Sequence, residues 1–216
     1  VHIKKVLGNI KRVYPAYEAK AGYELAGFVW FQGWNDMVDR GTYPNRAQLG
    51  GYAQYSEVLV HFIRDVRKGL SAPKLPFVIG VMGVGGPVEK YGPDQKRYAG
   101  IHSEFRKAMA APAKLSEFKG NVTAVFTENY WDHQLSGLSS RMGKVNAKRR
   151  SLGNDKTLSA EERRKLVEAY KADLFSKEEI RILETGISNA AYHYLGSSKV
   201  LGQIGKAFAD AQAQMQ

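Results

Sequence analysis

Three short apolar runs constrain the fold of this chain more than any other feature of its sequence. They cover residues 27–31, 77–81 and 122–126, and a polar or glycine-rich turn follows each one. Their hydrophobicity is nearly continuous rather than alternating, which is typical of strands covered on both faces within a parallel sheet. We therefore expect three buried parallel strands.

Between these runs, apolar residues recur every three or four positions. The first gap has Tyr52, Tyr55, Leu59, Phe62, Val66 and Leu70, and the second has Tyr98, Ile101, Phe105 and Ala108. This period predicts one crossover helix in each gap. The alternating order implies an α/β fold made of right-handed βαβ units, with the loops after the strands at the sheet edge where ligands bind.

The pattern changes between residues 134 and 188. Ser159 and Ser176 each stand three positions before a glutamate, which is the layout of a capping box at the start of a helix. We interpret the segment as a charged helical insertion. Its apolar stripe is expected to face the core and consists of Leu166, Tyr170 and Leu174.

The rest of the chain indicates a single folding unit. Residues 197–215 have one apolar face and are predicted to form a terminal docking helix. There is no internal repeat and no low-complexity linker, so we expect residues 1–216 to belong to one domain that carries the insertion 134–188.

The formal net charge of +11 raises the question of a nucleic-acid partner. Lysine and arginine are densest over residues 141–165, where apolar residues are few and aromatics absent, so we interpret them as a solvated basic surface and expect no nucleic-acid partner. The chain has no cysteine, which excludes disulfides, thiolate metal sites and a cysteine nucleophile. No apolar run approaches the roughly 20 residues of a membrane span, so no membrane partner is expected either.

A polar turn follows the first apolar run directly, as Gln32-Gly33-Trp34-Asn35-Asp36. A glycine at this point lets its backbone N–H approach a ligand, and a neighbouring asparagine amide adds a second donor. Two such donors can hold a developing oxyanion. The same residue types also suit a plain strand-to-helix turn, and the turn alone does not separate these two interpretations.

A polar and aromatic loop, residues 188–196, precedes the terminal helix and contains His193. An imidazole there is well placed to act as a general base. The alternative is a partly buried histidine whose nitrogens are satisfied by backbone groups. Glycines also crowd residues 80–86, but without dinucleotide-binding spacing, and we expect that loop to be a flexible rim of the substrate cleft.

Taken in order, the turn and the histidine loop resemble the SGNH hydrolases. Gly33-x-Asn35-Asp36 is similar to the third sequence block of that superfamily, and the loop around His193 is similar to its last block. The closest likeness is to the branch of sialate O-acetylesterases and acetylxylan esterases. It covers residues 28–37, 75–80, 192–197 and 204–208, and spans nearly the whole chain apart from the helical insertion.

The resemblance implies a three-layer α/β/α sandwich of flavodoxin-like topology, to which this chain contributes the third, fourth and fifth strands. It implies a carbohydrate O-acetylesterase that works through a serine/histidine acyl-enzyme mechanism, with no metal or organic cofactor. Gly33 and Asn35 would stabilise the oxyanion, and His193 would transfer the proton. The residues expected to contact the acetylated sugar are Gln32, Trp34, Asp36 and Tyr192.

Two departures from the family pattern affect the site. No Gly-Asp-Ser or Gly-Gln-Ser-Asn block occurs in the 216 residues, so we expect the nucleophilic serine to come from a missing N-terminal half of the domain, and this chain alone to be inactive. Ala190 stands where the family has the aspartate of an Asp-x-x-His block. We expect Asp132 to orient His193 instead, with Glu128, Asn189 or a backbone carbonyl as alternatives.

The rival to an esterase is a non-catalytic carbohydrate-binding or assembly module on a degenerate hydrolase fold, which Ala190 favours. It predicts sugar binding without release of acetate. A basic nucleic-acid-associated domain is a third interpretation. The sequence leaves the compartment open, and the carbohydrate substrate class favours a secreted or periplasmic location.

Overall fold

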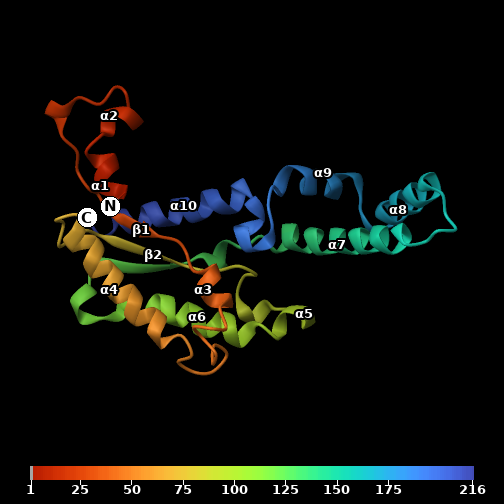
Figure 1. The fold of residues 1–216 in the computed structure, drawn as a ribbon, viewed down its shortest axis with the longest axis horizontal. Coiled ribbons are helices and arrows are strands. Elements are labelled where there is room, and N and C mark those ends of the chain that lie inside the picture. The colour runs from red at the N-terminus through yellow and green to blue at the C-terminus, as the bar shows by residue number, and fades with distance from the viewer. Residues whose placement is uncertain (1) are drawn as a thin grey trace.

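A computed structural model describes residues 2–216, and its centre is a parallel sheet of three strands (Figure 1). The strands are β1 (Phe28–Trp30), β2 (Phe77–Val81) and β3 (Val122–Phe126), in the spatial order β1-β2-β3. Phe28 pairs with Phe77, and Phe77 with Val122. Every residue of the central strand β2 is buried, as its continuous hydrophobicity predicts. The three expected strands are confirmed, the first being shorter than its apolar run.

Helices cover both faces of this sheet (Figure 1). α4 (Ala53–Gly69) and α6 (Ala99–Ala110) lie on one side and α10 (Ser198–Ala213) on the other. Gly80 of β2 lets α10 approach closely, because a Cβ there would come within 2.6 Å of the Phe208 ring. The result is a partial α/β/α sandwich, which confirms the fold class.

β1 is one of the two edge strands of the described sheet, the other being β3, and the two faces of β1 differ. Phe28 and Trp30 pack against Phe62 of α4, with ring centroids 5.9 and 4.5 Å apart. On the α10 side Val29 is 44% exposed, and Phe31, just after the strand, is 37% exposed. One side of β1 has no partner strand among residues 2–216. An apolar edge of this kind is a template for pairing with another strand.

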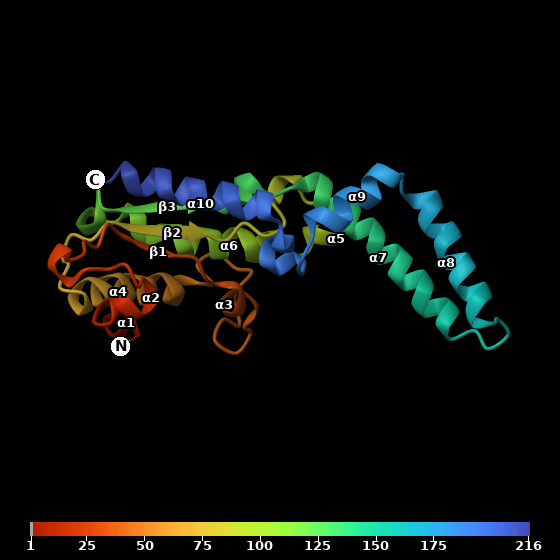
Figure 2. The same cartoon turned by 90° about the horizontal axis from the view of Figure 1, so that it is seen from above.

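Three helices form an arm that projects from the sheet (Figure 2). They are α7 (His133–Gly153), α8 (Ala160–Leu174) and α9 (Lys177–Gly186). Both expected capping boxes are present, with Ser159 capping α8 and Ser176 capping α9. The arm has its own apolar cluster, made by Leu138, Val145, Val167, Phe175 and Leu183.

The predicted stripe of α8 is partly wrong. Tyr170 and Leu174 pack against the arm's cluster, but Leu166 is 44% exposed and Val167 takes the buried position. α8 packs mainly against α7, so only a narrow face of it is covered. A helix in this position buries fewer residues than one that crosses a sheet.

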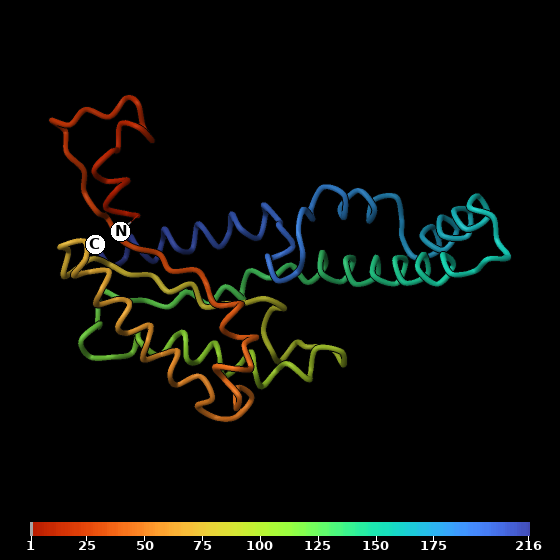
Figure 3. The backbone as a smooth tube through the Cα atoms, in the orientation of Figure 1, coloured from red at the N-terminus to blue at the C-terminus, as the bar shows by residue number. Residues whose placement is uncertain are grey.

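The remaining helical elements are short. They are α1 (His2–Leu7), α2 (Ile10–Val13), α3 (Trp34–Val38) and α5 (Pro93–Lys96), with single 3₁₀ turns at Ala19–Ala21, Val88–Lys90, Ala111–Lys114, Ser116–Phe118, Thr127–Tyr130 and Ala191–Gly196. α1 and α2 lie at the opposite end of the molecule from the arm (Figure 3). Within residues 2–216, no helix has the length and apolarity needed to cross a membrane.

Candidate active site

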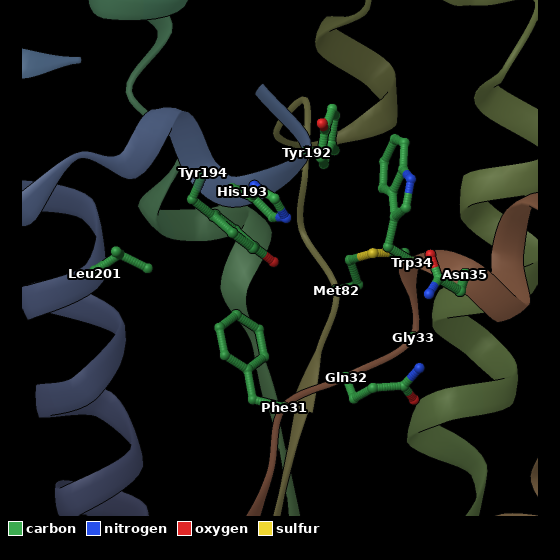
Figure 4. Close-up of a pocket in the computed structure, with 10 residues that line it drawn as sticks. All are labelled: Phe31, Gln32, Gly33, Trp34, Asn35, Met82, Tyr192, His193, Tyr194 and Leu201. Atoms are coloured by element: carbon green, nitrogen blue, oxygen red, sulfur yellow. The ribbon is translucent and has the colours of Figure 1, made fainter. Parts of the chain in front are cut away.

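A cavity of about 640 Å³ lies beyond the carboxyl ends of β1 and β2 (Figure 4). It brings together the turn after β1 and the loop before α10, which are far apart in sequence. Its walls are Phe31, Gln32, Gly33, Trp34, Asn35, Met82, Tyr192, His193, Tyr194 and Leu201. In Figure 4 the His193 loop and the Gly33 turn face each other across the cavity, with Met82 between them.

Gly33 begins α3 in a backbone conformation that only glycine adopts readily, with φ at 154°. A Cβ at this position would lie 2.8 Å from the Phe105 ring, so packing alone requires a glycine. No acceptor within residues 2–216 takes the Gly33 N–H or the side-chain amide of Asn35. Both donors are therefore available to a ligand in the cavity.

The other residues of the turn have separate positions. Gln32 lines the cavity and donates from Nε2 to Asp36 Oδ2 at 2.7 Å. Asp36 itself is not part of the cavity wall, so it acts on the site through Gln32. Trp34 stacks on Tyr192 with ring centroids 5.5 Å apart. This pair of rings joins the two sides of the cavity.

The loop that carries His193 has an unusual backbone. Tyr194, Leu195 and Gly196 all have positive φ, at 53°, 61° and 58°. Two of them are not glycine, and such residues persist in this region only where the surroundings hold them. Both Tyr194 and Leu195 are buried, which supplies the packing that holds the loop.

The hydroxyl of Tyr194 fixes the loop to the ends of two strands. It accepts a hydrogen bond from the Gly83 N–H at 2.8 Å and shares another, of 2.7 Å, with Thr127 Oγ1. Thr127 in turn donates to the carbonyl of Val81 at 2.7 Å. Burial raises the pKa of Tyr194, so its hydroxyl stays protonated and can both donate and accept.

His193 is exposed to the cavity, and its ring has one hydrogen-bond partner among residues 2–216. Nδ1 lies 3.0 Å from Asn189 Oδ1, which also accepts the Ala190 N–H at 2.8 Å. Because an amide oxygen only accepts, this contact requires the hydrogen on Nδ1, which in the neutral ring leaves the lone pair on Nε2. That tautomer is the one a general base needs.

The structure does not bring Asp132 to His193. Asp132 caps α7 by accepting the Leu135 N–H at 2.9 Å, and its second oxygen accepts from Lys199 Nζ at 2.8 Å. Burial would raise the pKa of Asp132, but these hydrogen bonds outweigh it and lower the pKa. Glu128, the other carboxylate considered, pairs with Arg106. No group of three His, Asp or Glu within residues 2–216 is arranged to hold a metal ion.

The glycine loop after β2 is buried, which contradicts the expected flexibility, although Met82 of this loop does line the cavity. Arg106 of α6 is only 5% exposed and donates to three carbonyls of this loop, those of Met82, Val84 and Gly86, at 2.8 to 3.0 Å. These bonds keep the loop against the body. Nothing in the helical pattern of α6 predicts that its arginine points inward.

Sequence reasoning missed three wall residues, namely Phe31, Met82 and Leu201, and it missed the anchoring role of Tyr194. Only Phe31 and Tyr194 carried a usable signal, since both adjoin the candidate motifs. Met82 and Leu201 reach the cavity through the packing of β2 and α10, which no local pattern reveals.

Comparison with known proteins gives one finding. A family model described as "Carbohydrate esterase, sialic acid-specific acetylesterase" matches residues 8–119, which is more than half of the chain. The matched stretch includes the Gly33 turn and ends before β3. No curated protein and no solved structure matches the chain.

Proposed function

Since the chain belongs to the sialic acid-specific acetylesterase family of carbohydrate esterases, we propose that its first cavity is one side of an active site that hydrolyses acetyl esters on sugars. The observation that carries this proposal is the cavity that Gly33, Asn35 and His193 line together. The Gly33 N–H and the Asn35 amide have no acceptor within residues 2–216, and both residues line the same cavity as the His193 imidazole. These are the groups that acyl transfer to a hydroxyl nucleophile requires.

In the proposed mechanism, His193 Nε2 takes the proton from a serine hydroxyl as its oxygen attacks the acetyl carbonyl. The negative charge that develops on the carbonyl oxygen is held by the Gly33 N–H and the Asn35 amide. The intermediate then collapses, the C–O bond to the sugar breaks, and His193 returns the proton to the leaving sugar oxygen. Water releases acetate from the serine by the same steps.

We propose that Asn189, rather than Asp132, orients the imidazole. Its Oδ1 holds Nδ1 at 3.0 Å, while both oxygens of Asp132 have other partners. An amide fixes the ring and its tautomer without contributing a negative charge. It therefore stabilises the protonated imidazole of the transition state less than a carboxylate does.

We further propose that the serine is supplied by polypeptide outside the 216 residues, as part of the same domain, with residues 134–188 as an insertion. No serine lines the first cavity within residues 2–216. The exposed side chains of Val29 and Phe31 and the unpaired edge of β1 support a further strand beside β1. Such a strand would end at the same sheet edge as β1.

Hydrolysis of an aryl acetate by the full-length protein tests the function. The His193→Ala variant is expected to lose about 10²–10⁴-fold in kcat/KM, the usual contribution of a general base. His61→Ala is a matched control, because His61 is an exposed residue of α4 remote from the cavity. Activity that survives His193→Ala at the wild-type level contradicts the proposal.

A serine-directed fluorophosphonate locates the nucleophile. We expect mass spectrometry to find the label on a serine outside the numbered sequence. A label on any serine of the 216 residues contradicts the proposed source of the nucleophile, while leaving the ester hydrolysis itself intact.

A second candidate function is sugar binding without hydrolysis, and the amide partner of His193 is the observation that favours it. It predicts that the full-length protein binds an acetylated sugar, releases no acetate and is not labelled by the fluorophosphonate. Release of acetate that depends on His193 excludes it.

A further inference from the structure

A cleft of about 400 Å³ lies on the arm, and we call it the arm cleft. Arg149 and Gly153 at the end of α7 form one wall, and Arg163 and Arg164 in the N-terminal part of α8 form another. The turn that joins these two helices lies at the tip of the arm (Figure 2). The arm cleft shares no lining residue with the first cavity, so it is separate from the site proposed for ester hydrolysis.

Positive charge dominates the walls of the arm cleft. Arg149, Arg163 and Arg164 line it together with a single carboxylate, that of Glu168. None of these four side chains forms an ion pair within residues 2–216. Three positive charges and one negative charge leave the walls with a net charge of +2.

The rest of α7 does not supply a counter-charge. This helix contains five Lys and Arg residues and no Asp or Glu. Of the five, only Arg141 forms an ion pair within residues 2–216, with Glu179. Lys148 and Arg150 stand on either side of Arg149 in the sequence, and both are exposed. Like charges at neighbouring positions repel one another, and an anion in the arm cleft would relieve this repulsion.

Arg163 is held in place at the edge of the arm cleft. It is half-buried, and its Nη1 donates to the carbonyls of Gly153 and Asp155 at 3.4 and 3.2 Å. Its Nε and Nη2 have no acceptor within residues 2–216, so these donors of the guanidinium fork remain available. A guanidinium that is already held loses less conformational freedom when a ligand binds.

A phosphate group matches these walls better than other common anions do. A phosphate monoester carries a charge of about −1.5 to −2 at pH 7 and has three acceptor oxygens, so it can bind several guanidinium groups at once. A carboxylate has one charge and two oxygens. No aromatic side chain lines the arm cleft, so a nucleobase would find no ring on which to stack. The walls therefore favour a small phosphorylated molecule over a nucleic acid.

We propose that the arm cleft binds the phosphate group of a small phosphorylated molecule through Arg149, Arg163 and Arg164. Its volume of about 400 Å³ leaves room for the group that carries the phosphate, since small-molecule sites measure about 300–1,000 Å³. This binding is independent of ester hydrolysis, because the two sites have no residue in common.

Calorimetry with the full-length protein tests the site, with inorganic phosphate as the probe and acetate as the comparison, at physiological ionic strength. We expect phosphate to bind at a single site and at least about tenfold more tightly than acetate. The difference corresponds to about one charge-assisted hydrogen bond, which a carboxylate with fewer oxygens does not make.

Arg149→Met and Arg150→Met form a matched pair of variants. Both remove one positive charge from adjacent positions of α7, but only Arg149 lines the arm cleft. Arg149→Met is expected to weaken phosphate binding about tenfold. Arg150→Met should weaken it by no more than about twofold, because salt screens a charge outside the cleft. Arg164→Met is a second cleft variant with the same expected loss, and it avoids the chain contacts that Arg163→Met would remove.

Three results would overturn the proposed site. The first is a wild-type protein that binds no phosphate. The second is equal weakening by Arg149→Met and Arg150→Met, because the charge of the whole arm rather than the cleft would then hold the anion. The third is binding to phosphatidylglycerol vesicles without binding of dissolved phosphate, which would identify a lipid surface as the partner.

None of these measurements involves an ester. A protein that binds phosphate in the arm cleft but releases no acetate therefore contradicts the proposed function and leaves the phosphate site standing. A protein that hydrolyses the aryl acetate but binds no phosphate does the reverse.

Discussion

The two sides of the first cavity are built in different ways. The Gly33 turn lies between β1 and α3, so regular backbone structure sets the position of its donors. The His193 loop lies between two helices, has three successive residues with positive φ, and is fixed to the sheet by the Tyr194 hydroxyl. One side is therefore positioned by secondary structure and the other by a few side-chain hydrogen bonds.

Apart from replacement of His193 itself, the largest expected effect is on the turn side. Asn35→Ala removes one proposed oxyanion donor and should lower kcat for an aryl acetate by about 10²–10³-fold, with the fold unchanged. The fold is expected to tolerate the change because Asn35 is exposed and its side chain has no partner within residues 2–216. Measuring kcat for the aryl acetate tests the effect on catalysis, and measuring the thermal unfolding midpoint of the same variant tests whether the fold is unchanged.

Asn129→Ala is the matched control for this prediction, since Asn129 is exposed and lies outside the cavity wall. Gly33→Ala is a poorer test, because its Cβ would contact Phe105 and change packing as well as catalysis. If Asn35→Ala keeps wild-type kcat, the turn is a plain strand-to-helix connection.

On the loop side, Tyr194→Phe should reduce stability and activity together. The change leaves the buried Gly83 N–H without its acceptor and removes one of the two hydrogen bonds of the buried Thr127 hydroxyl, which keeps the one to Val81, at a cost of about 1–3 kcal/mol. Urea unfolding measures the stability, and kcat/KM for the aryl acetate reports on the loop. Tyr23→Phe, at an exposed position, is the control.

A Tyr194→Phe protein that is destabilised but retains full activity would mean that other contacts of the loop suffice to position His193. Loss of both stability and activity would support the contrast between the two sides of the cavity. The single hydroxyl of Tyr194 would then determine the position of His193.

The same contrast explains what the sequence could and could not predict. The three strands, the crossover helices and both capping boxes follow from local patterns, because periodicity and capping residues act over a few positions. The positions of Gly33 and Asn35 follow from them, since the turn comes directly after a strand.

The second half of the site depends on contacts between distant residues. Tyr194 meets Gly83 and Thr127 only once the sheet has formed, and Arg106 turns inward onto the glycine loop for the same reason. In the arm, Val167 is buried where the sequence predicts Leu166. The side of α8 that packs against α7, rather than the apolar period, decides which residue is buried. Contacts between distant parts of the chain decide these positions, so a short stretch of sequence does not predict them.

A smaller effect is expected at Asn189. Asn189→Ala frees the imidazole of His193 to rotate and should lower kcat by about tenfold, the equivalent of one lost hydrogen bond. Asn189→Asp puts a carboxylate at the same place and favours the protonated imidazole. The acid limb of the pH–rate profile should then move to higher pH, because only the neutral ring accepts a proton.

The profile of kcat/KM against pH measures this change, with wild type and Asn189→Ala as references. Unchanged profiles in both variants would show that Asn189 does not orient the base. In that case the partner of the ring lies in polypeptide outside the numbered residues or is the backbone.

The smallest effect is expected at Asp132, and it concerns stability rather than rate. Asp132→Ala removes the cap of α7 and the contact with Lys199, and should cost about 1 kcal/mol of unfolding free energy. The lowered pKa of Asp132 sets the sign of the pH dependence. Its contribution is present above the unfolded pKa of about 4 and is lost as the pH falls through the folded value.

The difference in stability between wild type and Asp132→Ala should therefore be constant near neutral pH and shrink in acid, which urea unfolding at several pH values measures. Lys199→Met separates the ion pair from the cap, since it leaves the Leu135 hydrogen bond in place. If Asp132→Ala instead lowers kcat by about 10⁴-fold, as loss of a triad aspartate does, the carboxylate orients His193 during catalysis. Regular secondary structure would then position both sides of the cavity, because Asp132 at the start of α7, rather than the loop, would hold the base.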